Sequence, residues 1–202
     1  MKSRFIIIIL FIAIASFITG GYLAIKSLRN VDQLNFMLYN GPWRVNPSMD
    51  LKNTKQRALI AKVGLFALRE SEVIYYTAIM DSDGDPLDSD YDYILEGSVP
   101  NARYWSYTLY GKDNFMIPNP NKIYGYNDTS ISYTPKDSLN PELQNISQPT
   151  YTMHISKERT GENWIPSGEN NTMALTLRLY NASPEVYNNL TTIPLPSIKR
   201  VK

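Results

Sequence analysis

The chain begins with a long apolar run and then changes to shorter patterned segments. Between Phe5 and Ile25 no charged residue interrupts FIIIILFIAIASFITGGYLAI, and Lys26 ends the run. At about 1.5 Å per residue, a helix of this length crosses a hydrocarbon core of about 30 Å. A helix also satisfies its backbone polar groups internally, as a bilayer requires. The pattern therefore predicts an N-terminal transmembrane anchor over residues 1–25.

A cleaved signal peptide is the alternative interpretation of this segment. Lys2 and Arg4 would form its basic start, and Ala13–Ala15 would form a cleavage sequence before Ser16. Cleavage there would leave a short apolar region, whereas the apolar pattern continues beyond it to Ile25, so a retained anchor is favoured. The basic residues on the two sides nearly balance. We expect the N-terminus inside and the domain outside.

Helical spacing continues after the membrane segment. The apolar residues that recur at this spacing are Leu28, Val31, Leu34 and Leu38. Asn40, Gly41 and Pro42 form a stop signal, so residues 26–52 are predicted as a helical stalk and linker. A second helix is predicted from Asn53 or Thr54, because Leu59, Val63 and Phe66 form its apolar stripe.

The pattern then changes to strands. Runs rich in β-branched and aromatic residues lie at 72–80, 91–95, 102–110, 130–133, 151–156 and 173–180, separated by Gly, Pro, Asn and Asp. The proline-containing segment 134–150 is predicted to be an insertion loop. Residues 53–202 are therefore expected to form one mainly β domain, an antiparallel sandwich or barrel preceded by one or two helices.

Alternation assigns the side chains of two strands to opposite faces. In ARYWSYTLY one face carries Trp105, Tyr107 and Leu109, and the other carries Tyr104, Ser106, Thr108 and Tyr110. In MALTLRLY the four residues Met173, Leu175, Leu177 and Leu179 form a core face, opposite Thr176, Arg178 and Tyr180. Both strands thus present hydroxyls and tyrosines on one side.

Composition narrows the function classes. The 20 Lys and Arg residues nearly balance the 19 Asp and Glu residues, and no basic block is present, so nucleic-acid binding is not expected. The absence of Cys excludes disulfides, thiol nucleophiles and cysteine metal sites. His154 is the only imidazole, which excludes sites built from several histidines. No cofactor is expected.

Several fragments, in order, resemble a bacterial domain of unknown function, numbered 1214, in its short form with one N-terminal membrane helix. They are GPW at Gly41–Trp43, ESEVIYYTA, DSDGDPL, the Tyr91–Gly97 strand, ARYWSYTLYGKDNFMIPN, NWIP, LRLYNASPEV and LPSIKR. The resemblance implies a β-sandwich of jelly-roll type and brings no established reaction. It also implies a bacterial cell inner membrane, with the C-terminal domain in the periplasm.

The segment DSDGDPLDSDYD raises the question of a metal site. Asp81, Asp83 and Asp85 could present oxygens to Ca²⁺, but Pro86 stands where an EF-hand loop needs glycine. A tight turn with Gly84 at positive φ is the better interpretation, so no metal is predicted and calcium stays the weaker alternative.

Catalytic interpretations have little support in the sequence. A carboxylate pair for glycoside hydrolysis could come from Glu70, Glu72, Glu96, Glu158 and Glu162, but the sequence does not fix their separation. Ser106 lies in a strand without a nucleophile elbow, and His154 also lies in a strand. We therefore expect no catalytic residue.

The ligand-binding candidates are aromatic and polar side chains that suit a sugar or an anionic ligand. They are Tyr104, Ser106, Tyr110, Asn163, Trp164, Arg178 and Tyr180. The structural alternative is that the aromatic residues form the core. Arg178 must either reach a carboxylate or face a polar cavity, because an unpaired buried guanidinium is costly.

The predicted function is a membrane-anchored domain outside the cytoplasm that binds a ligand or a protein partner at the cell envelope. A hydrolase of envelope carbohydrate and an accessory subunit of a membrane complex are the alternatives. A hydrolase would bring two carboxylates together on the Trp/Tyr face, and a subunit would bury an apolar patch against its partners.

Overall fold

The computed structural model describes residues 2–29, 37–46, 54, 68–69, 71–135, 148–169 and 172–201. The chain divides into two units, Met1–Asn35 with Asp50–Ala67, and Phe36–Met49 with Leu68–Lys202. About half of the stalk and linker predicted at 26–52, and nearly all of the second predicted helix, lie outside the described residues. The same is true of the middle of the predicted insertion loop, whose ends are joined by a 2.8 Å bond from Thr134 N to Thr150 O.

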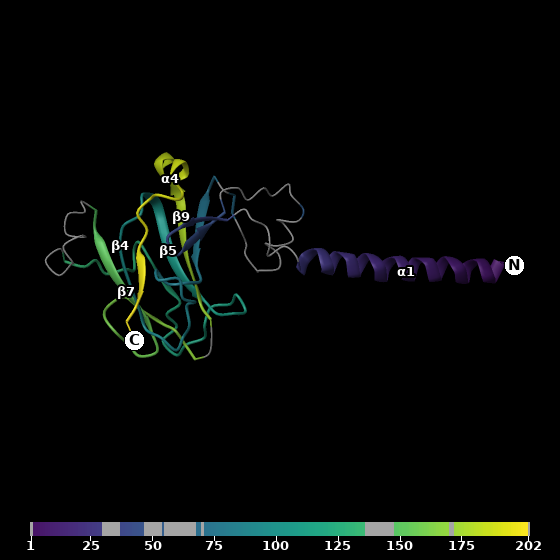
Figure 1. Cartoon of the computed structure of the whole chain (residues 1–202), viewed down its shortest axis with the longest axis horizontal. Helices are drawn as coiled ribbons and strands as arrows, with labels where there is room; N and C mark the ends of the chain where they lie inside the picture. Colours follow the sequence, from purple (N-terminus) through teal and green to yellow (C-terminus); the bar gives the residue numbers. More distant parts are fainter. Residues whose placement is uncertain are drawn as a thin grey trace. The chain divides into compact units, whose positions relative to one another are not determined.

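The helix α1, Lys2–Arg29, is one uninterrupted helix (Figure 1). Within it, Arg4–Lys26 is a 23-residue segment long and apolar enough to cross a membrane, and none of it is buried. A helix near the N-terminus with this length and composition fits a membrane anchor and a signal sequence alike. The apolar helix predicted from the sequence is therefore present.

The second unit is mainly β and contains two sheets. The six-stranded sheet has the order β1 (Leu38–Asn40), β2 (Trp43–Val45), β3 (Val73–Ala78), β9 (Ala174–Ala182), β5 (Ala102–Tyr110) and β6 (Gly125–Asn127), all antiparallel. The four-stranded sheet has the order β10 (Ser197–Arg200), β4 (Tyr93–Ser98), β7 (Thr150–Ser156) and β8 (Trp164–Pro166). A short helix, α4 (Pro184–Asn188), follows β9. The two sheets confirm the predicted sandwich, and its jelly-roll connectivity stays a prediction.

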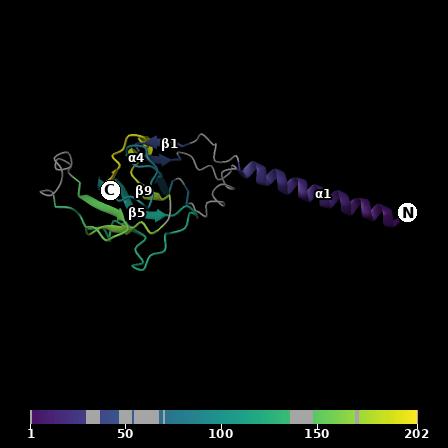
Figure 2. The same cartoon turned by 60° about the horizontal axis from the view of Figure 1, so that its bottom comes forward.

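The central pair of the larger sheet is β5 with β9, which lie side by side in both views (Figure 1, Figure 2). Tyr107 pairs with Leu177 and Ser106 pairs with Arg178. Trp105, Tyr107 and Leu109 are each 1% exposed, whereas the residues between them are half-buried. The alternation predicted from the sequence is confirmed, and it separates a core face from an outer face.

The core joins the two sheets through aromatic side chains. The hydroxyls of Tyr107 on β5 and Tyr151 on β7 lie 2.7 Å apart and are buried. The Trp105 ring stacks on Tyr151 with centroids 5.4 Å apart. Trp43 on β2 donates from Nε1 to the carbonyl of Pro196, 2.8 Å away, just before β10. Burial raises the pKa of Tyr107 and Tyr151, so both remain neutral and share one hydrogen bond.

Side chains also connect β6 to β8, from one sheet to the other. Tyr126 OH accepts a 3.0 Å bond from Trp164 N and lies 3.3 Å from the carbonyls of Glu162 and Trp164. The neighbouring Gly125 is required by close packing, because a Cβ there would lie 1.8 Å from Tyr107 O. The sequence therefore needs glycine beside the aromatic residue that makes the connection.

Several details differ from the sequence predictions. Leu38 was predicted as helix, but it begins β1, because Gly41 at φ 57° and Pro42 form a hairpin turn that pairs Asn40 with Trp43. The sandwich therefore includes part of the predicted stalk and linker. The predicted strand 130–133 is not a strand; β6 precedes it, and only Ile131 of its side chains is buried.

The four-stranded sheet is not wholly antiparallel as predicted, because β7 and β8 pair in parallel. The short strands β8 and β10 were not predicted, nor was α4. Three or four residues give too short a pattern for alternation to be recognised.

We predict that Tyr151→Phe destabilises the domain by about 1–3 kcal/mol, because it leaves the buried Tyr107 hydroxyl without its partner. The double variant Tyr107→Phe/Tyr151→Phe should lose clearly less than the sum of the single losses. The measurement is urea unfolding of the full chain in detergent.

Tyr104→Phe on the same strand is the matched control, and it should change the unfolding free energy by no more than about 0.5 kcal/mol. Strictly additive losses in the double variant would contradict a coupled hydroxyl pair.

Candidate functional site

The side chains of the six-stranded sheet that point away from the core form the surface that we call the outer face. Besides the buried Val73, which pairs with Tyr180, its polar and aromatic members include Arg44, Tyr75, Thr77, Tyr104, Ser106, Thr108, Tyr110, Thr176, Arg178 and Tyr180. Thr176 is buried and the others are half-buried. None of these strand positions carries a carboxylate, so the outer face is cationic, aromatic and rich in hydroxyls.

Strand register arranges the outer face in rows. Tyr180 on β9 pairs with Tyr104 on β5, and their rings lie 5.2 Å apart. In the next row Arg178 lies between Ser106 and Tyr75. The rows keep these side chains in fixed lateral order, because each position is set by backbone pairing.

The third row is made of threonines. Thr176 pairs with Thr108 on one side and Thr77 on the other, and the hydroxyls of Thr77 and Thr176 lie 3.1 Å apart. Arg44 on β2 extends the row because it pairs with Thr77.

Arg178 is the polar centre of the outer face. Its Nη1 donates to Thr108 Oγ1 over 2.9 Å, and its Nη2 donates to Tyr110 OH. Its Cζ lies 5.6 Å from the ring centre of Tyr110 and 5.9 Å from that of Tyr75. No carboxylate among the described residues pairs with Arg178. Hydroxyls and rings therefore hold the guanidinium in place without neutralising its charge.

Two of the predicted ligand residues lie elsewhere. Asn163 and Trp164 are 3% and 5% exposed, at the edge of the four-stranded sheet. The Asn163 amide accepts from Ser132 N over 2.7 Å and donates to Ser132 O and Thr152 O. Trp164 Nε1 lies 3.1 Å from Ser156 O and 3.0 Å from Ser156 Oγ. Their polar atoms are engaged internally, so they do not join Tyr104, Ser106, Tyr110, Arg178 and Tyr180.

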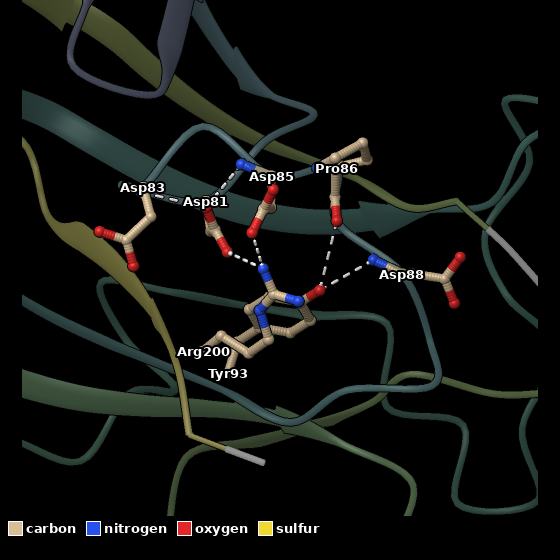
Figure 3. A network of polar contacts seen from close by, with 7 residues as sticks. All are labelled: Asp81, Asp83, Asp85, Pro86, Asp88, Tyr93 and Arg200. Carbon is tan, nitrogen blue, oxygen red and sulfur yellow. Dashed lines mark hydrogen bonds and ion pairs between the residues drawn. The ribbon is translucent and has the colours of Figure 1, made fainter.

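The Asp-rich turn has a structural organisation of its own (Figure 3). The side chain of Asp81 is fully buried, and its Oδ1 accepts from Asp83 N over 3.0 Å and from Asp85 N over 2.9 Å. Gly84 at φ 94° completes the predicted turn.

Arg200 of β10 supplies the positive charge of this turn. Its Nη2 pairs with Asp85 Oδ2 and lies 3.4 Å from Asp81 Oδ2. The second contact has ion-pair distance without hydrogen-bond geometry, since Asp81 Oδ2 makes no hydrogen bond among the described residues. The guanidinium also lies over the Tyr91 ring at 4.5 Å.

The oxygens that could bind calcium are thus already paired with Arg200, and Asp83 is exposed. Within the described ranges, no group of three or more His, Asp or Glu residues is arranged to hold a metal ion.

The serine and histidine candidates are not brought together. Ser106 lies on the outer face, whereas His154 lies on β7 of the other sheet, against Gly161. Partial burial lowers the pKa of His154. Of the glutamate candidates, Glu96 has its Oε2 3.5 Å from Lys199 Nζ. Glu70 lies outside the described residues. The described part of the chain therefore offers no serine–histidine pair.

Sequence reasoning missed Arg44, and it did not select Tyr75 and Thr108. Arg44 alternates with the buried Trp43 and Val45, which is a period-2 signal over three residues only. Alternation placed Thr108 on this face without making it a ligand candidate, and the same alternation on β3 could have found Tyr75.

Comparison with known proteins places the chain in a family. The model of the family described as "Protein of unknown function (DUF1214)" matches residues 72–184. The crystal structure of the VPA0106 protein from Vibrio parahaemolyticus is similar, with a TM-score of 0.55 and 26% identity, over 73% of this chain and 35% of that one. This likeness agrees with the fold.

A crystal structure of an uncharacterized protein from Burkholderia cenocepacia matches with a TM-score of 0.45 and 13% identity, over 91% of this chain and 42% of that one. That likeness is too low to support an argument. The chain thus spans less than half of the length of either structure. No curated protein matches the sequence.

We predict that Asp81→Ala destabilises the domain by about 1–3 kcal/mol, because two turn amides lose their acceptor and Arg200 loses a partner. Asp83→Ala, in the same turn and exposed, is the matched control and should change stability by no more than about 0.5 kcal/mol. Thermal and urea unfolding of the full chain in detergent measure both.

One contradicting outcome is that Asp83→Ala destabilises the domain more than Asp81→Ala does. A melting temperature that rises with calcium and no longer does so in Asp83→Ala would show a metal site in place of a structural turn.

Proposed function

This chain belongs to the DUF1214 family of proteins of unknown function, and we propose that its β-sandwich is a binding module whose outer face holds a hydroxyl-rich ligand of the cell envelope, such as a glycan. The observation that carries the proposal is the half-buried Arg178, held by Thr108 and Tyr110 with its charge uncompensated among the described residues. The outer face around it supplies the other contacts.

The chemistry of the outer face suits a sugar. A sugar presents hydroxyls at its edges and apolar C–H groups on its faces. Tyr75, Tyr104, Tyr110 and Tyr180 supply aromatic surface with a polar tip, and Ser106 supplies a hydroxyl. Arg178 adds charge-assisted donors that strengthen polar contacts. A few fixed polar groups among aromatic side chains are typical of small-molecule sites.

Binding is favoured over hydrolysis by what the outer face lacks. Glycoside hydrolysis commonly uses two carboxyl groups about 5–10 Å apart on either side of the bond. The described strand positions of the outer face carry none. The hydrolase alternative would therefore require acids from outside these strands.

The location is part of the same proposal. We infer that α1 is a retained single-pass anchor, with the sandwich outside the cytoplasm, in the periplasm of a bacterium with its N-terminus inside. The support is the uncharged run from Phe5 to Ile25 and its exposed apolar side chains. The domain boundaries are then the anchor at 1–25, a connecting segment, and a sandwich that already includes β1.

We predict that Arg178→Met abolishes or weakens binding by at least about tenfold while changing stability by no more than about 1 kcal/mol. Methionine keeps much of the apolar volume and deletes the charge and the donors. Binding of the full chain in detergent to an oligosaccharide array, with co-purification from native membranes, measures the loss.

Arg103→Met is the matched control, because Arg103 is an exposed arginine of the same strand as Tyr104 but points to the other side. The proposal fails if Arg178→Met keeps its ligand, or if it destabilises the domain by about 3 kcal/mol or more, as removal of a buried pairing partner would.

We also predict that the full chain stays in the membrane pellet after carbonate washing. Residues 71–202 should resist protease until the outer compartment is opened. A soluble protein whose N-terminus begins near Ser16 would show a cleaved signal sequence in place of an anchor.

A further inference from the structure

Arg44 lies on the same face as Arg178 and near it. It lies between Trp43, which is fully buried, and Val45, which is 1% exposed, so alternation directs it outward. It pairs with Thr77, which pairs with Thr176, two positions before Arg178 on β9. With strands about 4.8 Å apart and about 3.4 Å per residue, the two arginine Cα atoms are separated by about 12 Å.

Among the described residues, the two arginines give the outer face positive charge that no carboxylate compensates. No described carboxylate forms an ion pair with either of them. The Nε of Arg44 is buried and has no hydrogen-bond partner among the described residues. The described partners of Arg178 are hydroxyls and rings. A half-buried charge without a counterion and a buried donor without an acceptor both cost free energy.

An anionic ligand would remove both costs. Guanidinium groups match carboxylate, phosphate and sulfate groups because their planar donors bind two oxygens at once. Tyr75, Thr77 and Thr176 lie between the two arginines and suit the uncharged part of a sugar chain. A neutral glycan would use those contacts and leave the charges uncompensated.

We propose that the ligand of the outer face is an acidic oligosaccharide whose negative groups bind Arg44 and Arg178, with Arg44 as a second anchor across two strands. This inference rests on the proposed glycan-binding function. It adds the charge of the ligand and a residue that the sequence did not indicate.

The test uses probes that differ only in charge. The full chain in detergent is titrated with hexagalacturonate, and with the same hexamer after complete methyl esterification, which removes its charges. Dextran sulfate and dextran oligosaccharides form a second pair, which separates sulfate from carboxylate recognition. We expect at least one acidic probe to bind tenfold or more tightly than its neutral partner, with the preference decreasing as salt rises.

Variants then assign the preference to Arg44. Arg44→Gln should lower affinity for the acidic probe at least tenfold and affinity for the neutral probe by much less, so that the preference falls. Arg44→Lys keeps the charge but loses the geometry that binds two oxygens at once, so it should retain part of the preference. That result shows the role of the charge at Arg44 even where Arg44→Gln does not fold. Arg103→Gln, which removes an exposed arginine outside the outer face, should bind like the unchanged chain.

The alternative outcomes are distinct. Equal binding of charged and neutral probes overturns this inference and leaves the proposed function standing. Equal losses in Arg103→Gln and Arg44→Gln, or complete loss of the preference in Arg44→Lys, also overturn it, since these outcomes indicate general electrostatic attraction or a packing role of Arg44. Binding of no probe, charged or neutral, contradicts the proposed function and this inference together.

Discussion

The buried contact between Tyr107 and Tyr151 is the constraint on which the rest of the sandwich depends. These residues lie on different sheets, and their hydroxyls, 2.7 Å apart, can satisfy each other only if both strands keep their registers. A slip by one residue on β5 would turn Tyr107 outward and bring Ser106 or Thr108 into the core. The same register also places Ser106 and Thr108 beside Arg178, so the core contact determines the composition of the outer face.

Long strands could be predicted from the sequence because their signal is repeated. On β5 and β9, aromatic and leucine residues alternate with polar residues over several positions, and the structure buries the apolar set. Tyr104, Ser106, Tyr110, Arg178 and Tyr180 were therefore assigned to one side correctly. Short strands offer no such repetition. β2 has three residues, so its outward Arg44 could not be distinguished from a linker residue.

Tertiary pairings were beyond local reasoning for a different reason. Asp81 and Arg200 are far apart in sequence. They meet because β10 pairs with β4 and Ile198 of β10 exchanges hydrogen bonds with Ser82 of the turn. The local sequence showed a series of acids that resembled calcium ligands, but their counterion came from the other end of the chain. The sequence also suggested Asn163 and Trp164 as ligand residues. Their polar atoms already form hydrogen bonds with Ser132, Thr152 and Ser156, and local sequence does not show these partners.

The partners of Arg178 and Arg200 explain why the outer face suits a ligand and the Asp-rich turn does not. Arg200 contacts two carboxylates, so its charge is compensated within the protein and an added anion would compete with Asp81 and Asp85. Arg178 is held as firmly, but by Thr108, Tyr110 and two rings, all of them neutral. Neutral partners fix the orientation of a guanidinium and leave its electrostatic attraction for anions intact, which is the preorganisation that a binding site requires. The partner type, more than the burial of the arginine, therefore separates a structural cation from one available to a ligand.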